Sequence, residues 1–226
     1  MFSIPEGLAS EDAAVMLCAG ATVYEPLIEY IKRGDAGKEE EAKGKGERVG
    51  VIGLGGLGHL GVLFAKALGF EHVVAFSRRD NKRADALALG ADSYIATSDQ
   101  TDWAEQHASS LDLIICTVSD PRMPLSSYLS LLRPRGRFCQ VGIPEEPLPQ
   151  LDTMALVLNG TSICFSDSAS PGNVRRMLEL AAEKGVKAWT QVRGMEEVNE
   201  VVREMGEGRA RFRFVLENKE VKGDGA

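Results

Sequence analysis

Six consecutive residues, Gly53–Gly58 (Gly-Leu-Gly-Gly-Leu-Gly), form the most informative motif of the sequence. Glycines at the first, third and sixth positions allow a tight turn, close approach of the backbone to a pyrophosphate, and close packing of helix on strand. The pattern directly follows an apolar strand-like segment, 49–52, and opens a segment of helical spacing, 57–68. The N-terminus of such a helix presents free N–H groups to phosphates. We therefore predict a dinucleotide phosphate loop; the alternative is a glycine-rich turn that binds nothing.

The end of the next apolar segment, 73–76, indicates which dinucleotide the loop would hold. An acidic residue at that point would bind a ribose 2′-hydroxyl and favour NAD(H). This sequence has Ser77 and Arg78 instead, with Lys82 close behind, and Asp80 comes only after the strand end. A hydroxyl and several cations suit a 2′-phosphate, because guanidinium groups bind phosphate in forked pairs. We therefore predict NADP(H) rather than NAD(H); the alternative is a solvated basic loop at a helix start.

The elements that position these residues follow an alternating pattern. Strands are expected at 49–52, 73–76, 94–96, 111–116, 136–141 and 162–165, and helices at 57–68, 82–89, 126–132 and 173–184. Alternation of this kind means βαβ units and a parallel sheet. The predicted fold class is α/β, a Rossmann-type doubly wound parallel sheet. Thr117, and Val141 with Ile143, follow later strands and would lie at the carboxyl edge, where such folds bind ligands.

The flanks of the predicted sheet have their own patterns. A helix is expected over 12–34, with Ser10 as its N-cap and a break near Tyr24–Pro26. Near the other end, a helix over 196–205 and a strand over 212–216 need not belong to the sheet. The predicted organisation has five parts: an N-terminal helical segment (1–33), a charged insertion (34–47), the cofactor domain (48–190), a C-terminal helix and strand (191–217) and a disordered tail (218–226).

Composition limits the function further. The chain has 226 residues, 44% of them hydrophobic and 26% charged, which is the balance of an ordinary globular protein. Its net charge of −7 argues against a general nucleic-acid binder. The longest apolar stretch, 54–70, is interrupted by glycines, His59 and Lys66, so we expect no membrane span. The four cysteines form no CxxC pair, and we expect reduced thiols and a cytoplasmic location.

Several motifs in the same order resemble a known family, the cinnamyl-alcohol-dehydrogenase type of the zinc-containing medium-chain alcohol dehydrogenases. The NADP-dependent fungal-like members look most similar. The resemblance covers roughly residues 2–217 apart from 34–47. It rests on Leu17-Cys-Ala-Gly-Ala-Thr-Val-Tyr24, the glycine motif with His59, Leu89-Gly-Ala-Asp92, Gly136-Arg137, Val141-Gly-Ile-Pro144 and Arg211-Phe-Arg-Phe214.

The resemblance implies specific roles for single residues. It implies that the phosphate loop consists of Gly53, Gly55, Gly56, Leu57 and Gly58. It implies that a 2′-phosphate is held by Ser77, Arg78 and Lys82. It places Thr22 near the nicotinamide, Val141 and Ile143 at its carboxamide, and Arg211 near the pyrophosphate. Cys18 matches one ligand of the family's catalytic zinc.

The resemblance also implies that the family's N-terminal catalytic domain, with most of its zinc ligands, lies outside this sequence. A catalytic zinc needs about three protein ligands. Cys18 has no Cys or His neighbour at metal-binding spacing, so we expect this chain alone not to bind zinc. Val15, Leu17, Val23 and Leu27, with Phe212 and Phe214, would then face solvent or a partner, and a homodimer is possible.

The resulting hypothesis is the cofactor-binding part of an NADP(H)-dependent alcohol dehydrogenase. Such an enzyme reduces aldehydes or oxidises primary alcohols by hydride transfer, and this chain alone would be weak or inactive. The alternatives are a non-catalytic NADP(H)-binding module and a truncated remnant. The sequence identifies neither a catalytic base nor a nucleophile.

Overall fold

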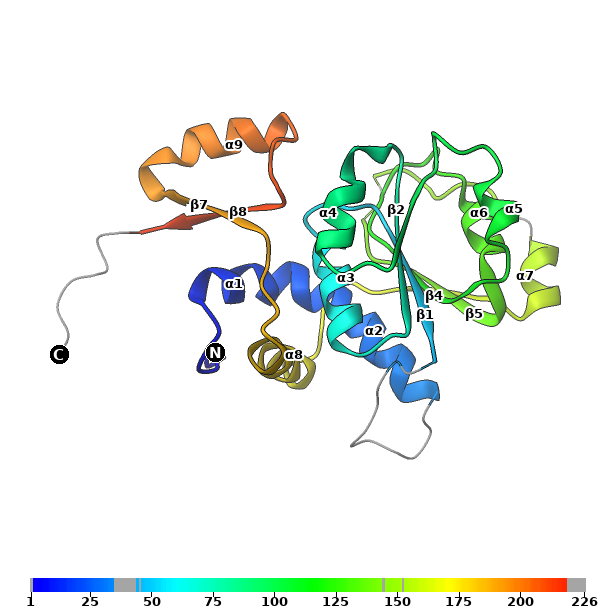
Figure 1. The fold of residues 1–226 in the computed structure, drawn as a ribbon, viewed down its shortest axis with the longest axis horizontal. Helices are drawn as coiled ribbons and strands as arrows, with labels where there is room; N and C mark the ends of the chain where they lie inside the picture. Colours follow the sequence, from blue (N-terminus) through cyan, green and yellow to red (C-terminus); the bar gives the residue numbers. More distant parts are fainter. Residues whose placement is uncertain (1, 35–43, 45, 144, 152, 219–226) are drawn as a thin grey trace.

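The computed structural model describes residues 2–34, 44, 46–143, 145–151 and 153–218. Its main feature is a six-stranded parallel sheet with the order β3-β2-β1-β4-β5-β6 (Figure 1). The strands are β1 (Arg48–Ile52), β2 (His72–Ser77), β3 (Ser93–Ala96), β4 (Leu111–Cys116), β5 (Leu132–Gln140) and β6 (Ser162–Phe165). This order is the doubly wound Rossmann arrangement, so the predicted fold class is confirmed.

Helices cover both faces of the sheet, and each face has its own apolar core. The helical segments that connect or flank these strands are α1 (Ser10–Val15), η1 (Met16–Gly20), α2 (Ala21–Gly34), α3 (Gly58–Ala67), η2 (Asp80–Lys82), α4 (Arg83–Ala88), α5 (Trp103–Gln106), α6 (Leu125–Ser130), α7 (Thr153–Asn159) and α8 (Pro171–Lys184). The strands in the middle of the sheet are mostly apolar because helices bury them on both sides. Every residue of β4 is buried.

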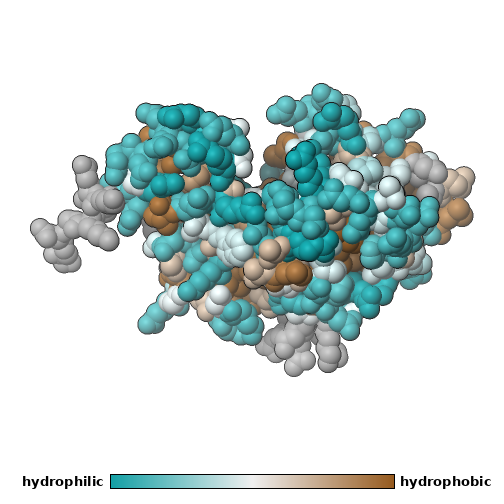
Figure 2. Space-filling model, turned by 45° about the horizontal axis from the view of Figure 1, so that its top comes forward, coloured by the Kyte–Doolittle hydropathy of each residue, from teal (hydrophilic) through white to brown (hydrophobic). Residues whose placement is uncertain are grey.

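A second unit lies outside this sheet. It consists of β7 (Thr190–Gly194), η3 (Met195–Glu197), α9 (Val198–Gly206) and β8 (Arg213–Glu217), with β7 and β8 paired in parallel. Figure 1 shows this unit beside the sheet domain, and the space-filling view shows a notch between the two (Figure 2). Strand β7 and helices α5 and α7 were not predicted from the sequence.

The N-terminal helix differs from the prediction in two respects. Ser10 is the first helical residue, and the capping position is Ala9, which has no side chain that could cap. The helix also continues through Pro26 instead of breaking there. Val23 and Leu27, on either side of that proline, are fully buried. Their burial compensates for the single backbone hydrogen bond that Pro26 removes.

The expected exposed apolar surface on this helix is also wrong for most of its residues. Val15, Val23 and Leu27 are buried in the core, where α2 packs against α3 and α8, and Leu17 alone of the four is exposed. The continuous helix Ser10–Lys32 has a mean hydropathy of 1.2, enough by length and composition for a membrane span, but 61% of its apolar window is buried. This pattern fits a core helix.

Phe212, also expected to be exposed, is only 4% accessible. Apolar side chains are exposed in other places. One group lies on α7 and β6 and comprises Met154, Val157, Leu158 and Phe165. Figure 2 shows apolar surface at the end of the molecule where α7 lies. The other group, on the C-terminal unit, comprises Val192, Met195, Val202 and Met205.

Candidate functional site

A cleft of about 950 Å³ opens at the carboxyl ends of β1, β2 and β4. Its walls are the loops that follow these strands, and the start of β8 closes one side. This edge is where strand order reverses between β1 and β4, the point at which doubly wound sheets bind ligands. The predicted phosphate loop, the predicted basic strand end and Thr117 all line this one cleft.

The phosphate loop depends on the absence of side chains at two glycines. Gly53 has φ of +90°, and a Cβ there would lie 2.7 Å from Thr117 Oγ1. A Cβ on Gly58 would lie 2.9 Å from the Gly53 carbonyl carbon and closer still to its oxygen. Gly55, in contrast, has open space where a Cβ would be, on the side of the cleft. These glycines bring the start of α3 against the end of β1 and leave the loop open to a ligand.

The first four carbonyl groups of the loop, those of residues 53–56, each accept a hydrogen bond from a side chain. The donors come from four different parts of the chain. The bonds are Thr117 Oγ1 to Gly53 O (2.9 Å), Lys82 Nζ to Leu54 O (2.6 Å), His59 Nδ1 to Gly55 O (3.0 Å) and Arg213 Nε to Gly56 O (3.1 Å). Because the carbonyls are bound to protein, the loop's backbone conformation is fixed before any ligand arrives.

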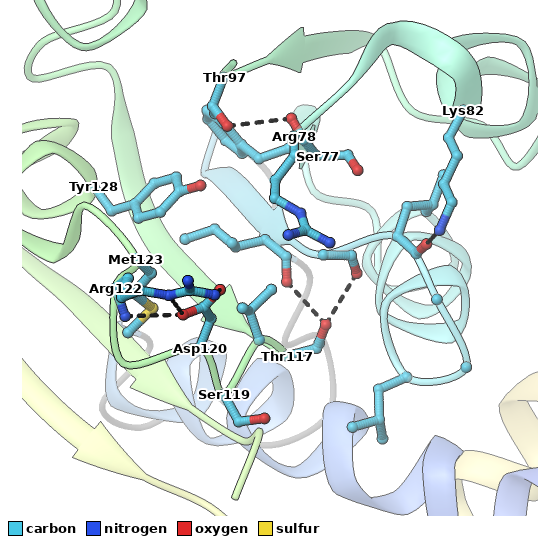
Figure 3. A pocket seen from close by; sticks show the side chains of 18 of the residues that line it. Ser77, Arg78, Lys82, Thr97, Thr117, Ser119, Asp120, Arg122, Met123 and Tyr128 are labelled. Carbon is cyan, nitrogen blue, oxygen red and sulfur yellow. Dashed lines mark hydrogen bonds and ion pairs between the residues drawn. The ribbon is translucent and has the colours of Figure 1, made fainter. Parts of the chain in front are cut away.

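The basic strand end contains one cation that reaches into the cleft and one that is bound to protein. Ser77, Arg78 and Lys82 all line the cleft. Arg78 is exposed, and its guanidinium lies toward the middle of the cleft (Figure 3). The ammonium of Lys82 is bound to Leu54 O, and burial lowers its pKa, with Arg211 adding to the effect. Arg78 is therefore the cation best placed to meet a phosphate.

Not all of the other residues predicted to contact the cofactor line the cleft. Thr117 lines it and donates to both Ile52 O and Gly53 O, each at 2.9 Å (Figure 3). Val141 is buried and Ile143 is 77% exposed, just beyond β5. Thr22 does not line the cleft; its hydroxyl bonds to Cys18 O and Asp167 O, each at 3.0 Å.

Arg211 lies outside the cleft, where its guanidinium pairs with Asp85. Arg213, two residues later, lines the cleft next to Gly56. The sequence Arg-Phe-Arg-Phe offers two arginines of equal character, and only the three-dimensional position separates them. The sequence reasoning also missed Phe212, Asp120 and Tyr128, which line the cleft as well. The loop from Val118 to Pro124 carries no recognisable motif.

The described residues do not fit a zinc ion. Cys18 is an exposed thiol on η1. Across the part of the chain that the structure describes, no three His, Cys, Asp or Glu side chains gather as metal ligands would. Since a catalytic zinc needs about three such ligands, the described residues cannot hold one by themselves.

Comparison with known proteins places the chain in a family. The model of the zinc-binding dehydrogenase family matches residues 56–183, which is more than half of the sequence. The chain therefore belongs to the zinc-binding dehydrogenases, as the sequence motifs predicted.

Relatives and solved structures agree with this assignment. Cinnamyl alcohol dehydrogenase 1 of Medicago truncatula is 41% identical over 217 residues, 96% of this chain and 57% of that protein. NADP-dependent alcohol dehydrogenase 6 of Saccharomyces cerevisiae is 36% identical over 94% of this chain and 56% of its own length. A cinnamyl alcohol dehydrogenase structure from Sorghum bicolor superposes with a TM-score of 0.82 at 36% identity, covering 98% of this chain and 58% of that one.

A fourth comparison concerns the cofactor. The structure of a cinnamyl alcohol dehydrogenase from Helicobacter pylori, described as a complex with NADP(H), has a TM-score of 0.78 at 27% identity. It covers 97% of this chain and 58% of that one. The chain thus spans a little under three fifths of the length of these relatives, and it is their cofactor-binding part that it matches.

Proposed function

We propose that this chain binds NADP(H) and serves as the cofactor-binding part of an alcohol dehydrogenase that interconverts aldehydes and primary alcohols. The observation that carries the proposal is one cleft lined both by a glycine phosphate loop and by Arg78. The names of two relatives, one NADP-dependent and one a complex with NADP(H), agree with it.

The residues in the cleft suit the parts of the cofactor. Backbone N–H groups of Gly55, Gly56 and Leu57, at the N-terminus of α3, would hold the pyrophosphate. Ser77 and Arg78 would hold the 2′-phosphate by a hydroxyl and a forked guanidinium. Bound nicotinamide supplies the hydride chemistry itself, and the protein orients it.

The other half of the reaction needs groups that the described residues do not provide. Reduction of an aldehyde develops negative charge on the substrate oxygen, which an enzyme must stabilise. Among the described residues, no cluster of His, Cys, Asp or Glu side chains could hold a metal ion that would do so. We infer that the substrate-side groups come from outside this chain, and that the chain alone turns over slowly or not at all.

A fluorescence titration with NADPH and NADH tests the cofactor proposal. Arg78→Ala removes the cation that reaches into the cleft, while Arg79→Ala removes an exposed neighbour that does not line it. A charged hydrogen bond contributes about 1.5–3 kcal/mol, so Arg78→Ala should weaken NADPH binding about 10- to 100-fold. The same variant should leave NADH binding nearly unchanged, and Arg79→Ala should affect neither. Tighter binding of NADH by the wild type, or no binding at all, would refute the proposal.

A non-catalytic NADP(H)-binding module is the second candidate. It is favoured by the lack of clustered metal ligands in the described ranges, next to a complete phosphate loop. An assay with NADPH, an aromatic aldehyde and added Zn²⁺ separates the two candidates. Turnover by the purified chain that depends on zinc would exclude the module; tight NADPH binding without turnover would support it.

A further inference from the structure

His59 is a buried histidine for which the proposed function has no role. It is the second residue of α3 and is fully inaccessible to solvent. Burying an imidazole is costly unless its polar atoms are hydrogen-bonded. Its contacts therefore show what the side chain does.

The contacts of the ring determine its protonation. Nδ1 lies 3.0 Å from Gly55 O, and since a carbonyl oxygen only accepts, Nδ1 must carry a proton. Nε2 is buried with no hydrogen-bond partner among the described residues. A proton on Nε2 would add an unpaired buried charge, and burial lowers the pKa of the ring to about 4. The ring is therefore the uncharged Nδ1–H tautomer at neutral pH.

The flat face of the same ring contacts the C-terminal unit. His59 stacks on Phe212 with 5.3 Å between ring centroids and 24° between planes. Phe212 in turn stacks on Trp189 at 5.7 Å and 22°. The residue after Phe212 is Arg213, whose Nε donates to Gly56 O. His59 thus contacts the phosphate loop through its edge and the segment that carries Arg213 through its face.

We propose that His59 is a positioning residue of the cofactor cleft, which holds the Gly55 carbonyl with Nδ1–H and Arg213 in place through Phe212. This inference rests on the proposed NADP(H) site and assigns one residue to its pyrophosphate end. His59 itself does not line the cleft, so it acts through the loop and Arg213.

Two amide variants separate this role from simple filling of space. In His59→Asn, the side-chain amide can reach the position of Nδ1 and donate to Gly55 O. In His59→Gln, the longer side chain carries its amide toward the position of Nε2, where none of the described residues offers a partner. His107→Gln, a histidine after α5 and away from the cleft, is the matched control.

The readout compares NADPH with 2′-AMP, which has the 2′-phosphate but no pyrophosphate. A lost hydrogen bond is worth about 1 kcal/mol, so His59→Gln should weaken NADPH binding about fivefold to tenfold. Binding of 2′-AMP should stay within about twofold, because Arg78 and Ser77 do not contact His59. His59→Asn should recover most of the NADPH affinity. In an Arg213→Ala background the effect of His59→Gln should shrink, since part of that effect depends on the hydrogen bond from Arg213 to Gly56 O.

Five results would overturn the inference. Equal NADPH affinity of His59→Gln and wild type would show that the ring positions nothing. Equal weakening of NADPH and 2′-AMP, with a lowered melting temperature, would show a general structural role. Ring-nitrogen NMR of the wild type that shows the Nε2–H tautomer would contradict the Gly55 bond directly. If wild type binds 2′-AMP but not NADPH, the inference fails; if it binds neither, the proposed function fails with it.

Discussion

Substituting alanine for either of two glycines in α3 should have opposite effects on stability. In Gly58→Ala, the new Cβ overlaps the carbonyl carbon and oxygen of Gly53, which are backbone atoms and cannot easily move aside. In Gly61→Ala, the Cβ lies 3.3 Å and 3.7 Å from the two methyl carbons of Val51, which can shift slightly. Gly61 lies inside α3, so Gly61→Ala should gain helix propensity, up to about 1 kcal/mol, whereas Gly58 is the first residue of the helix and should gain little. Only Gly58→Ala must move the start of the helix away from the strand.

The size of the difference follows from these contacts. Overpacking of a tight site costs about 1–3 kcal/mol. Gly58→Ala should lose this amount and Gly61→Ala should gain up to about 1 kcal/mol from helix propensity. The unfolding free energies of the two variants should therefore differ by about 2–4 kcal/mol. For a chain of this size, 1 kcal/mol shifts the melting temperature by about 2–4 °C, so the gap should be about 5–15 °C.

Thermal unfolding followed by circular dichroism without cofactor measures this difference. NADPH titration of both variants shows whether the loop is still formed: Gly61→Ala should bind as the wild type does, and Gly58→Ala should bind weakly. Melting temperatures of the two variants within about 2 °C of each other would refute the packing argument, because that gap is below 1 kcal/mol.

Three further predictions concern other groups. Burial lowers the pKa of His59 from 6.5 to about 4, so the unfolded chain takes up a proton at this residue before the folded chain does. The unfolding free energy should therefore be unaffected by this group above pH 6.5 and should fall by up to about 3 kcal/mol as pH drops toward 4. Urea unfolding at several pH values compares wild type with His59→Asn, and the same pH dependence of the unfolding free energy in both would refute the prediction. In a thiol titration of the native chain, the exposed Cys18 should react first. Cys116 should react only on unfolding, because burial hides its thiol and raises its pKa to about 12; rapid labelling of Cys116 would contradict this. Asp112 accepts hydrogen bonds from Arg48 N (2.8 Å) and Arg133 Nη1 (3.1 Å), so Asp112→Ala should cost about 1–3 kcal/mol of unfolding free energy in chemical denaturation. Asp102→Ala should cost nothing measurable, because Asp102 is exposed and makes no side-chain capping bond to α5; equal losses for the two variants would refute the prediction.

The sheet and its ligand edge could be predicted because local signals determine them. Segments such as β4 were located to the residue, since a strand buried on both faces consists almost entirely of apolar residues. The glycine loop was predictable for a similar reason: the required backbone conformation selects a residue type that is visible in the sequence.

Features that depend on distant contacts could not be predicted. The break expected at Pro26 does not occur, because burial of Val23 and Leu27 is decided by packing against other helices. The sequence gives no sign that the Lys82 ammonium donates to the Leu54 carbonyl, 28 residues away. Nothing in the Arg-Phe-Arg-Phe segment indicates which arginine turns to the cleft, since alternate residues share one side.

The hydrogen bond between Arg213 and Gly56 joins residues 157 positions apart. During synthesis the glycine loop leaves the ribosome long before its partner exists, and domains form as their residues emerge. The cleft is therefore completed late, after the sheet beside it has emerged in full. A ligand that requires the loop conformation fixed by all four side-chain hydrogen bonds can bind only after Arg213 has been added to the chain. NADP(H) would therefore stabilise the folded protein against unfolding without guiding the early folding of its sheet.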